Sequence, residues 1–244
     1  MVFIIEAILS GNTQQIMLQL LASIVVVFIA LPLHECAHGF VAKKLGDPTA
    51  SNMGRLTLNP LAHFDPIGTT ALILVGFGWA KPVPVNPYYF KNRKNGMALT
   101  ALAGPVSNLL IAAVALMAYK LLYYFVPVNA FVQILASVMV LIAQIDISLC
   151  AFNLIPLPPL DGSKIIGFFL PMNWYARFEN FFARYQQIVL YMMIFLFFIL
   201  PRLGGPFSII SNAIDIPFNF LWNAMFWVAD KLTFFVDLIA RAIG

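Results

Sequence analysis

Charge is the scarcest property of this 244-residue chain. Only 10% of its residues are Asp, Glu, Lys or Arg, whereas a typical soluble domain carries about 25%. Apolar residues make up 61% of the chain, and its mean hydropathy is +0.89. Because charged side chains are too few to cover a large soluble domain, the composition excludes a water-soluble globule and indicates a helical integral membrane protein.

Cysteine and N-terminal basic residues are also scarce. Cys36 and Cys150 lie in apolar segments without CxxC spacing, which excludes a disulfide framework and predicts two small buried side chains. The first ten residues contain Glu6 and no basic residue, so we expect no secretory signal peptide and a retained first apolar run.

The net charge of +4 does not require nucleic acid as a partner, because basic residues of a membrane protein mostly set its orientation. The expected surroundings are a lipid bilayer, with no nucleic acid.

Four apolar runs predict membrane helices, at about 14–44, 97–119, 130–153 and 188–200, the last preceded by an interfacial stretch at 173–187. In the tail, residues 207–244, polar residues recur at intervals of seven and four, which predicts one polar face of a helix. This stripe comprises Asn212, Asn219, Asn223, Asp230, Asp237 and Arg241. The tail helix could lie in the interface, pack on the bundle or form a fifth span. We therefore predict an all-α helical integral membrane protein with roughly four to six membrane helices.

The stretch from 46 to 95 is the least helical part of the chain, because prolines interrupt it repeatedly. Within it, residues 69–79 are apolar, but about 11 residues are too few to span a bilayer as a helix. We expect a short re-entrant or β-like segment there, packed on protein or beside a water-filled cavity. The prolines of residues 82–86 favour extended backbone.

Basic residues cluster after the first predicted span. Between residues 43 and 96 lie seven Lys and Arg residues against Asp47 and Asp65. By the positive-inside rule this region is cytoplasmic, and Arg177 and Arg184 return to the same side two spans later. We expect a multi-pass protein of the cell membrane whose functional site lies toward the cytoplasm.

A His-Glu-x-x-His motif, residues 34–38, lies at the end of the first apolar run. His34 and His38 are four residues apart on a helix and can hold one metal ion together. Glu35 lies beside them, where it can take a proton from a metal-bound water. The alternative is a pair of core histidines, but intramembrane ionisable residues are costly and are functional candidates by default.

A catalytic zinc site needs a third protein ligand, and Asp161 is the best candidate. It follows the proline-broken segment 153–160, begins a predicted helix and precedes Gly162, which permits close approach. The alternative is that Asp161 only caps that helix.

Three segments together resemble the site-2 protease family of intramembrane zinc metalloproteases. They are HECAH at 34–38, AGPVSN at 103–108 and NLIPLPPLDG at 153–162, in this order and in three apolar segments. The resemblance covers about 16–169, and the stretches GRLTLNP at 54–60 and GWAKP at 78–82 suggest a compact prokaryotic-type branch.

The resemblance implies that His34, His38 and Asp161 bind one zinc ion per chain and that Glu35 is the general base. It also implies that Asn153 holds the substrate backbone or oxyanion. Residues 1–244 would form a single membrane-embedded peptidase domain, with a catalytic core at about 14–170 and C-terminal helices at about 173–244. Unlike better-known members of the family, this chain is expected to have no room for a PDZ or CBS domain. The sequence gives no indication of the oligomeric state.

Other polar residues have less defined roles. His63 could stabilise its loop, act as a gating residue or support the site without binding metal. Asp146 lies seven residues before Asn153, hence on nearly the same helical face, where it could orient a ligand or pair with Gln144 or with the hydroxyl of a neighbour. Asn108 is expected to form a hydrogen bond between helices.

The predicted function is hydrolysis of peptide bonds in or near transmembrane segments of membrane proteins. The substrate helix must unwind there, and the extended chain could pair with backbone near residues 69–86. The alternative is a non-proteolytic membrane zinc protein, such as a carrier, a sensor or an inactive relative of the proteases. A carrier would not need Glu35 between its ligands and would show polar residues along several spans.

Overall fold

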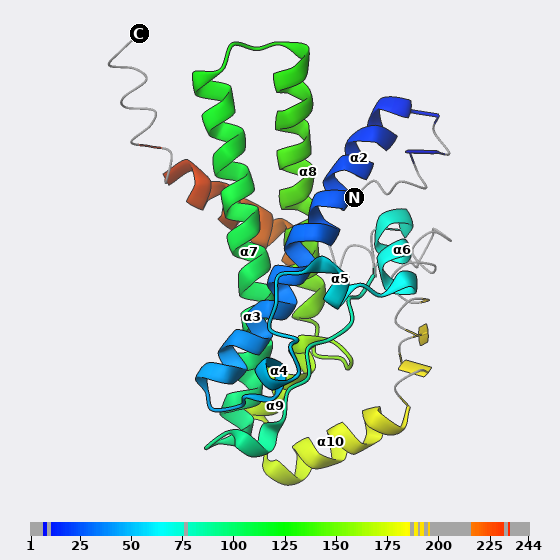
Figure 1. The fold of residues 1–244 in the computed structure, drawn as a ribbon, viewed down its shortest axis with the longest axis vertical. Coiled ribbons are helices and arrows are strands. Elements are labelled where there is room, and N and C mark those ends of the chain that lie inside the picture. The colour runs from blue at the N-terminus through cyan, green and yellow to red at the C-terminus, as the bar shows by residue number, and fades with distance from the viewer. Residues whose placement is uncertain are drawn as a thin grey trace.

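The computed structural model describes residues 7–8, 11–75, 78–185, 188–189, 191–192, 195, 216–231 and 234 (Figure 1). The regular structure of these residues is helical throughout, and none of them belongs to a strand. Three helices among them are long and apolar enough to cross a membrane: Thr13–Lys44, Arg93–Phe125 and Ala130–Asn153. The all-α membrane architecture and the first three spans are therefore confirmed.

The first span is one continuous helix with a change of winding in its middle. It comprises α2 (Thr13–Val25), a π-helical turn (Val26–Ala30) and α3 (Leu31–Lys44). Asn12 caps its start, because the side-chain oxygen accepts a hydrogen bond from the Gln15 N–H. The π-helical turn ends two residues before Pro32, which lacks the N–H that a regular helix needs. The widened turn thus lies one helical turn before the His-Glu-x-x-His motif.

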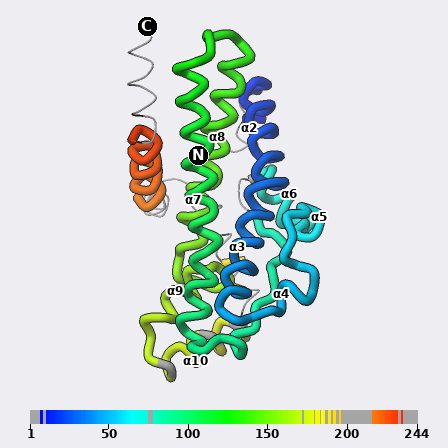
Figure 2. The backbone as a smooth tube through the Cα atoms, turned by 60° about the vertical axis from the view of Figure 1, so that its left-hand side comes forward, coloured from blue at the N-terminus to red at the C-terminus, as the bar shows by residue number. Residues whose placement is uncertain are grey.

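The second and third spans form a hairpin. Helix α7 (Arg93–Phe125) is longer than the predicted 97–119, and α8 (Ala130–Asn153) begins and ends as predicted. Asn92 and Asn129 cap the two helices by accepting hydrogen bonds from the N–H groups of Asn95 and Val132. Figures 1 and 2 show the two helices side by side, joined by a short loop.

Helix α7 is the central element of the bundle. It packs against α8, α3 and the short helix α9 (Asp161–Phe169), while α2 packs against α8 (Figure 2). The core contains many alanines, which allow close approach of helices in a membrane protein. Its fully or almost fully buried members include Ala22, Val26, Ala112, Leu116, Ala143 and Ile147. This packing brings α3 and α9, the helices that carry the predicted ligands, to the same side of α7.

The connection from 45 to 92 contains short helices: α4 (Thr49–Asn52), α5 (Pro60–His63), α6 (Pro66–Val75) and a 3₁₀ turn (Pro87–Tyr89). The expected β-like segment is therefore wrong for residues 69–75, which belong to α6. A short apolar run does not distinguish a strand from a buried helix, and here the Asp65 side chain accepts a hydrogen bond from the Gly68 N–H and starts a helix. Residues 78–86 contain no helix, in agreement with the extended backbone predicted for 82–86.

The chain after α9 continues into α10 (Met172–Arg184), which lies across one end of the bundle (Figure 1). Most of the predicted fourth span, 188–200, falls outside the described residues, as do Asn212, Asp237 and Arg241 of the tail stripe. A helix at 216–231 packs on the core through Leu221, Trp222, Met225 and Phe226. Its Asn219, Asn223 and Asp230 are exposed, so the polar stripe faces away from the bundle, although Asp230 forms an ion pair with Lys120 of α7.

The cap of α8 gives a test of the hairpin. Asn129→Ala should lower the free energy of unfolding by about 1 kcal/mol, because the N–H of Val132 loses its acceptor. Asn129→Ser is the matched control and should keep most of the stability, since serine caps nearly as well. Unfolding in mixed detergent micelles with increasing SDS would measure both, and equal stability of Asn129→Ala and wild type would contradict the capping role.

Candidate metal centre

His34 and His38 lie one turn apart on α3 with their rings close together. The ring centroids are 4.7 Å apart, the planes are nearly perpendicular at 87°, and the two Nε2 atoms are 3.0 Å apart. Both side chains are buried, at 7% and 8% exposure. The structure thus brings together the two ring nitrogens that the sequence predicted as ligands.

The other nitrogen of each ring is held by α7. His38 Nδ1 donates a hydrogen bond to the carbonyl of Thr100 at 2.7 Å, and His34 Nδ1 donates to Asn108 Oδ1 at 3.3 Å. Ligand histidines are commonly oriented in this way, because a donating Nδ1–H leaves a lone pair on Nε2. Asn108 therefore forms the predicted hydrogen bond between helices, and the two bonds assign both Nε2 atoms as acceptors.

Gly104 explains how α7 comes so close to the histidines. A Cβ atom at this position would overlap the imidazole rings of both His34 and His38. The next residue, Pro105, cannot donate an N–H to the Ala101 carbonyl, so the helix is less regularly bonded beside the Thr100 carbonyl. Where α7 faces the histidine pair, it therefore has both a residue without a side chain, Gly104, and a missing helical hydrogen bond at Pro105.

Asp161, the first residue of α9, faces the same two histidines. Its Oδ2 lies 3.4 Å from His34 Nε2 and 3.2 Å from His38 Nε2, and its other oxygen lies 3.8 Å from Lys164 Nζ. No side-chain cap bond forms at the start of α9, so the expected alternative of a helix cap is wrong. Gly162 allows the start of α9 to lie close to the preceding backbone, because a Cβ at this position would overlap the carbonyl oxygens of Leu154 and Ile155.

The three side chains fit a metal ion. Their donor atoms all lie within 4.8 Å of one another, and all three residues are buried. Two lone pairs and a carboxylate oxygen separated by 3.0 to 3.4 Å would repel one another without a cation. Ligand atoms about 2.0–2.1 Å from a tetrahedral zinc are about 3.3 Å apart, which matches this spacing.

The ionisation of Asp161 agrees with such a site. Burial by itself raises the pKa of this carboxyl, but without a metal ion a protonated Nε2 of His34 or His38 takes the cation's place, and its hydrogen bond and charge outweigh the burial. The net pKa lies below its ordinary value, so the group is a carboxylate at neutral pH.

A cavity of about 800 Å³ opens beside the three side chains. His34, Glu35, His38, Asn153, Asp161 and Lys164 supply much of its polar lining. Glu35 Oε2 accepts a hydrogen bond from the Val83 N–H at 2.8 Å. Asn153 uses one amide hydrogen for the carbonyl of Leu149 at 3.0 Å and so keeps a second donor and its carbonyl oxygen.

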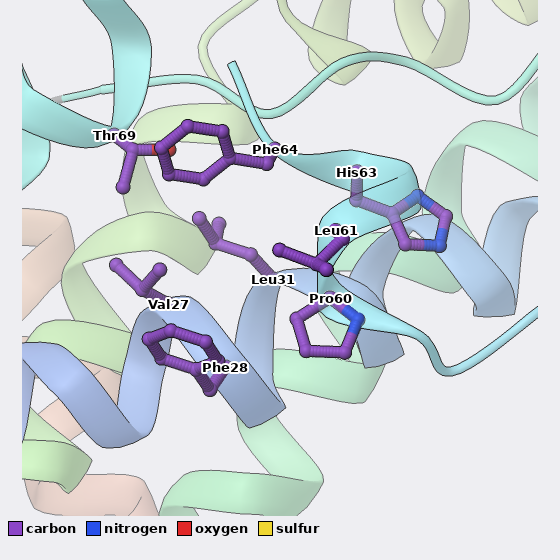
Figure 3. A pocket seen from close by; sticks show the side chains of 8 residues that line it. All are labelled: Val27, Phe28, Leu31, Pro60, Leu61, His63, Phe64 and Thr69. Carbon is purple, nitrogen blue, oxygen red and sulfur yellow. The ribbon is translucent and has the colours of Figure 1, made fainter. Parts of the chain in front are cut away.

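His63 lies apart from this group. It lines a separate hollow of about 10 Å³ with Leu31, Phe64 and other residues of the first span, α5 and α6 (Figure 3). Its Nε2 donates to the carbonyl of Thr57 at 2.8 Å, and its own carbonyl accepts from the Lys81 N–H. A hollow of this size holds about one water molecule, and these bonds give His63 a structural role in the loop.

Asp146 is fully buried in α8, and among the described residues neither of its carboxyl oxygens has a hydrogen-bond partner. The expected pairing with Gln144 is therefore not formed within the part of the chain that the structure describes. Three groups near the site were not predicted from the sequence: the Thr100 carbonyl, the Val83 N–H and Lys164. Two of these are backbone groups, which no residue type reveals, whereas the position of Lys164 one turn after Asp161 is a signal that could have been used.

Comparisons with known proteins agree with this geometry. A family model described as Peptidase family M50 matches residues 22–200. "Putative zinc metalloprotease YwhC" of Bacillus subtilis is 38% identical over 174 residues, 70% of this chain and 78% of that protein. "Putative zinc metalloprotease Rip2" of Mycobacterium tuberculosis H37Rv is 30% identical over 185 residues, 73% of this chain and 67% of that protein. No solved structure matches the chain.

Gly104 gives a test of the metal centre that leaves all three donor side chains in place. Gly104→Ala should weaken zinc binding about 10- to 100-fold, because the added methyl group displaces the imidazole rings that α7 orients. Zinc retained during titration with a chelator would be measured by elemental analysis.

Leu102→Ala is the matched control, because this side chain lies on the same helix but is 40% exposed. It should leave zinc affinity unchanged. Wild-type zinc affinity in Gly104→Ala would show that contact of α7 with the histidine pair does not shape the site.

Proposed function

The chain belongs to peptidase family M50, the site-2 protease family, and on this premise we propose that it is an intramembrane zinc endopeptidase. It is a zinc metalloprotease of the site-2 type by family, and its three apolar helices make it a membrane protein. Our proposal is the finer statement that it hydrolyses peptide bonds in or near transmembrane segments of membrane proteins, in regulated intramembrane proteolysis.

The main support for this proposal is that the Glu35 carboxylate and the three metal donors lie in one cavity. Glu35 lies in the same cavity as His34, His38 and Asp161, and the cavity is bordered by helices apolar enough to cross a membrane. A carrier or sensor needs the three donors but has no use for a second acidic group, Glu35, beside them. A protease does, because a proton must pass from water to the leaving amine.

We propose that His34 and His38 through Nε2, and Asp161 through Oδ2, hold the zinc ion. When bound, zinc would polarise the scissile carbonyl and lower the pKa of a water molecule. Glu35 would accept the proton of the attacking water and deliver it to the amine that leaves. Its position one residue after His34 keeps it beside the donors.

Asn153 would hold the substrate. Its remaining amide hydrogen can donate to a substrate carbonyl or to the oxyanion that develops there. A cavity of about 800 Å³ has room for several residues of an extended peptide, but it is too small for a folded domain. A helical substrate would therefore have to unwind locally to expose its carbonyl.

The same proposal covers topology and domain organisation. We propose a single peptidase domain with its catalytic core at about 14–170 and C-terminal helices at about 173–244. The protein would cross the cell membrane four to six times, with a short re-entrant segment at about 69–79 and the cavity open to the cytoplasm. The seven basic residues between 43 and 96 support this orientation.

The central test is Glu35→Gln, with zinc content and cleavage recorded on the same purified sample. The variant should keep its zinc, because Glu35 is not among the three donors, and should lose at least about 10²-fold in cleavage rate, as expected for a general base. A panel of membrane-anchored reporter substrates with different transmembrane segments would be used in detergent and in vesicles.

Asp161→Asn is the companion variant and should lose zinc and cleavage together. If the wild type binds zinc but cleaves no member of the panel, the non-proteolytic interpretation takes the place of the protease. If Glu35→Gln cleaves at the wild-type rate, another group must accept the proton.

A further inference from the structure

We infer that the backbone of Val83 positions the catalytic carboxylate of Glu35. The segment 81–86, which we call the strap, passes beside the metal centre and donates one hydrogen bond to it, from Val83 N–H to Glu35 Oε2 at 2.8 Å. This inference rests on the proposed role of Glu35 as general base and adds a positioning residue from another part of the chain.

The strap presents few backbone donors. Pro82 and Pro84 lack an N–H, so the only donors between residues 81 and 86 are those of Lys81, Val83, Val85 and Asn86. Lys81 and Asn86 are used at the two ends of the strap. Because a residue before proline favours extended backbone, Val83 is held in the conformation that directs its N–H sideways, toward α3.

Both ends of the strap are fixed. At its start, the Lys81 N–H donates to the His63 carbonyl at 2.8 Å, and Arg55 Nη2 donates to the carbonyls of Lys81 and Pro82 at 2.8 and 3.2 Å. At its end, the Asn86 N–H donates to Asp47 Oδ2 at 2.6 Å. Asp47 is fully buried, and its other oxygen accepts from the Thr49 N–H at 2.9 Å. A segment fixed at both ends can hold a side chain in one place.

Gly39 allows the strap to lie against α3. It is one helical turn after Glu35, and a Cβ at this position would lie only 3.1 Å from Val83 Cγ1 and 3.2 Å from Leu56 Cδ1. Val83 itself is buried, with 8% exposure. The side chain of Val83 therefore packs on the helix beside Gly39 while its N–H reaches Glu35.

The hydrogen bond selects one orientation of the carboxylate. A glutamate has three side-chain torsions, and without a partner the carboxylate would sample several positions in a cavity of this size. With Oε2 held by Val83, Oε1 keeps both lone pairs for the proton of a water molecule. The fixed ends of the strap argue for a permanent positioning contact and against a gate that must open.

Val83→Pro tests this inference, because it removes the N–H and keeps extended backbone in a residue that already precedes a proline. We expect kcat to fall about 10- to 100-fold, since a displacement of about 1 Å costs up to that factor. KM should change less than about twofold and zinc content should be unchanged, because the hydrogen bonds of the strap among the described residues go to Glu35 and to the anchors at its two ends, not to the three donors.

One control variant separates the loss of the N–H from the effect of an added proline. Val85→Pro adds a proline to the same strap at an N–H that bonds to no described residue. It should keep kcat within about twofold of wild type. An equal loss of kcat in Val85→Pro, or a normal kcat in Val83→Pro, would overturn the positioning role.

A measurement without substrate distinguishes this inference from the proposed function. In protein labelled with ¹⁵N-valine, the Val83 amide proton should move upfield in Glu35→Ala, because a hydrogen bond to a carboxylate is lost. An unchanged Val83 resonance overturns the contact whether or not the wild type cleaves. A wild type that cleaves nothing, with the resonance shifted as expected, refutes the protease role and leaves the contact established.

Discussion

Two imidazoles and a carboxylate lie within 3.4 Å of one another inside an apolar helical bundle, and the rest of the structure follows from that arrangement. Removing such groups from water is costly unless each polar atom has a partner or the group binds a metal. The protein meets this requirement on both sides of the rings. Each Nδ1 has a hydrogen-bond acceptor on α7, and each Nε2 faces the Asp161 carboxylate across a distance suited to a metal ion.

Helix α7 has no donor atom among the three, yet it determines where they meet. It contacts α3 and α9, which carry the donors, and it supplies both Nδ1 acceptors, which lie about two turns apart. Gly104 lies between those acceptors and leaves space for the rings. A chain that kept all three donors but carried a larger residue at 104 would thus have the ligands without the site, since the rings and α7 would compete for the same volume.

The sequence predicted those features that depend on the type of residue. Long uncharged runs predicted the three spans, and α8 was predicted to end where it does because the prolines of segment 153–160 cannot continue a helix. The donors were predicted because histidine and aspartate are rare in apolar surroundings and ligate metals. By contrast, the β-like alternative for residues 69–75 is wrong, because they form a helix, and a short apolar run fits either structure.

Contacts made by backbone atoms were not predictable in this way. The Thr100 carbonyl and the Val83 N–H are groups that nearly every residue has, so their roles depend on where the folded chain places them. For Asp146 the residue type was misleading. Its carboxyl group suggested a partner, but helix packing determines which neighbours bury it, and among the described residues none of them pairs with either oxygen.

Prolines line the cavity where the chain is irregular. Two segments without long helices border the cavity, and three of their prolines, Pro82, Pro158 and Pro159, are among its lining residues. Irregular backbone in an apolar environment is costly because its N–H groups lack partners, and each proline removes one such donor. The carbonyls remain, and they can accept hydrogen bonds from water or from an extended peptide. Proline-rich backbone beside the donors therefore lowers the cost of an open, hydrated site within a bundle that otherwise excludes water.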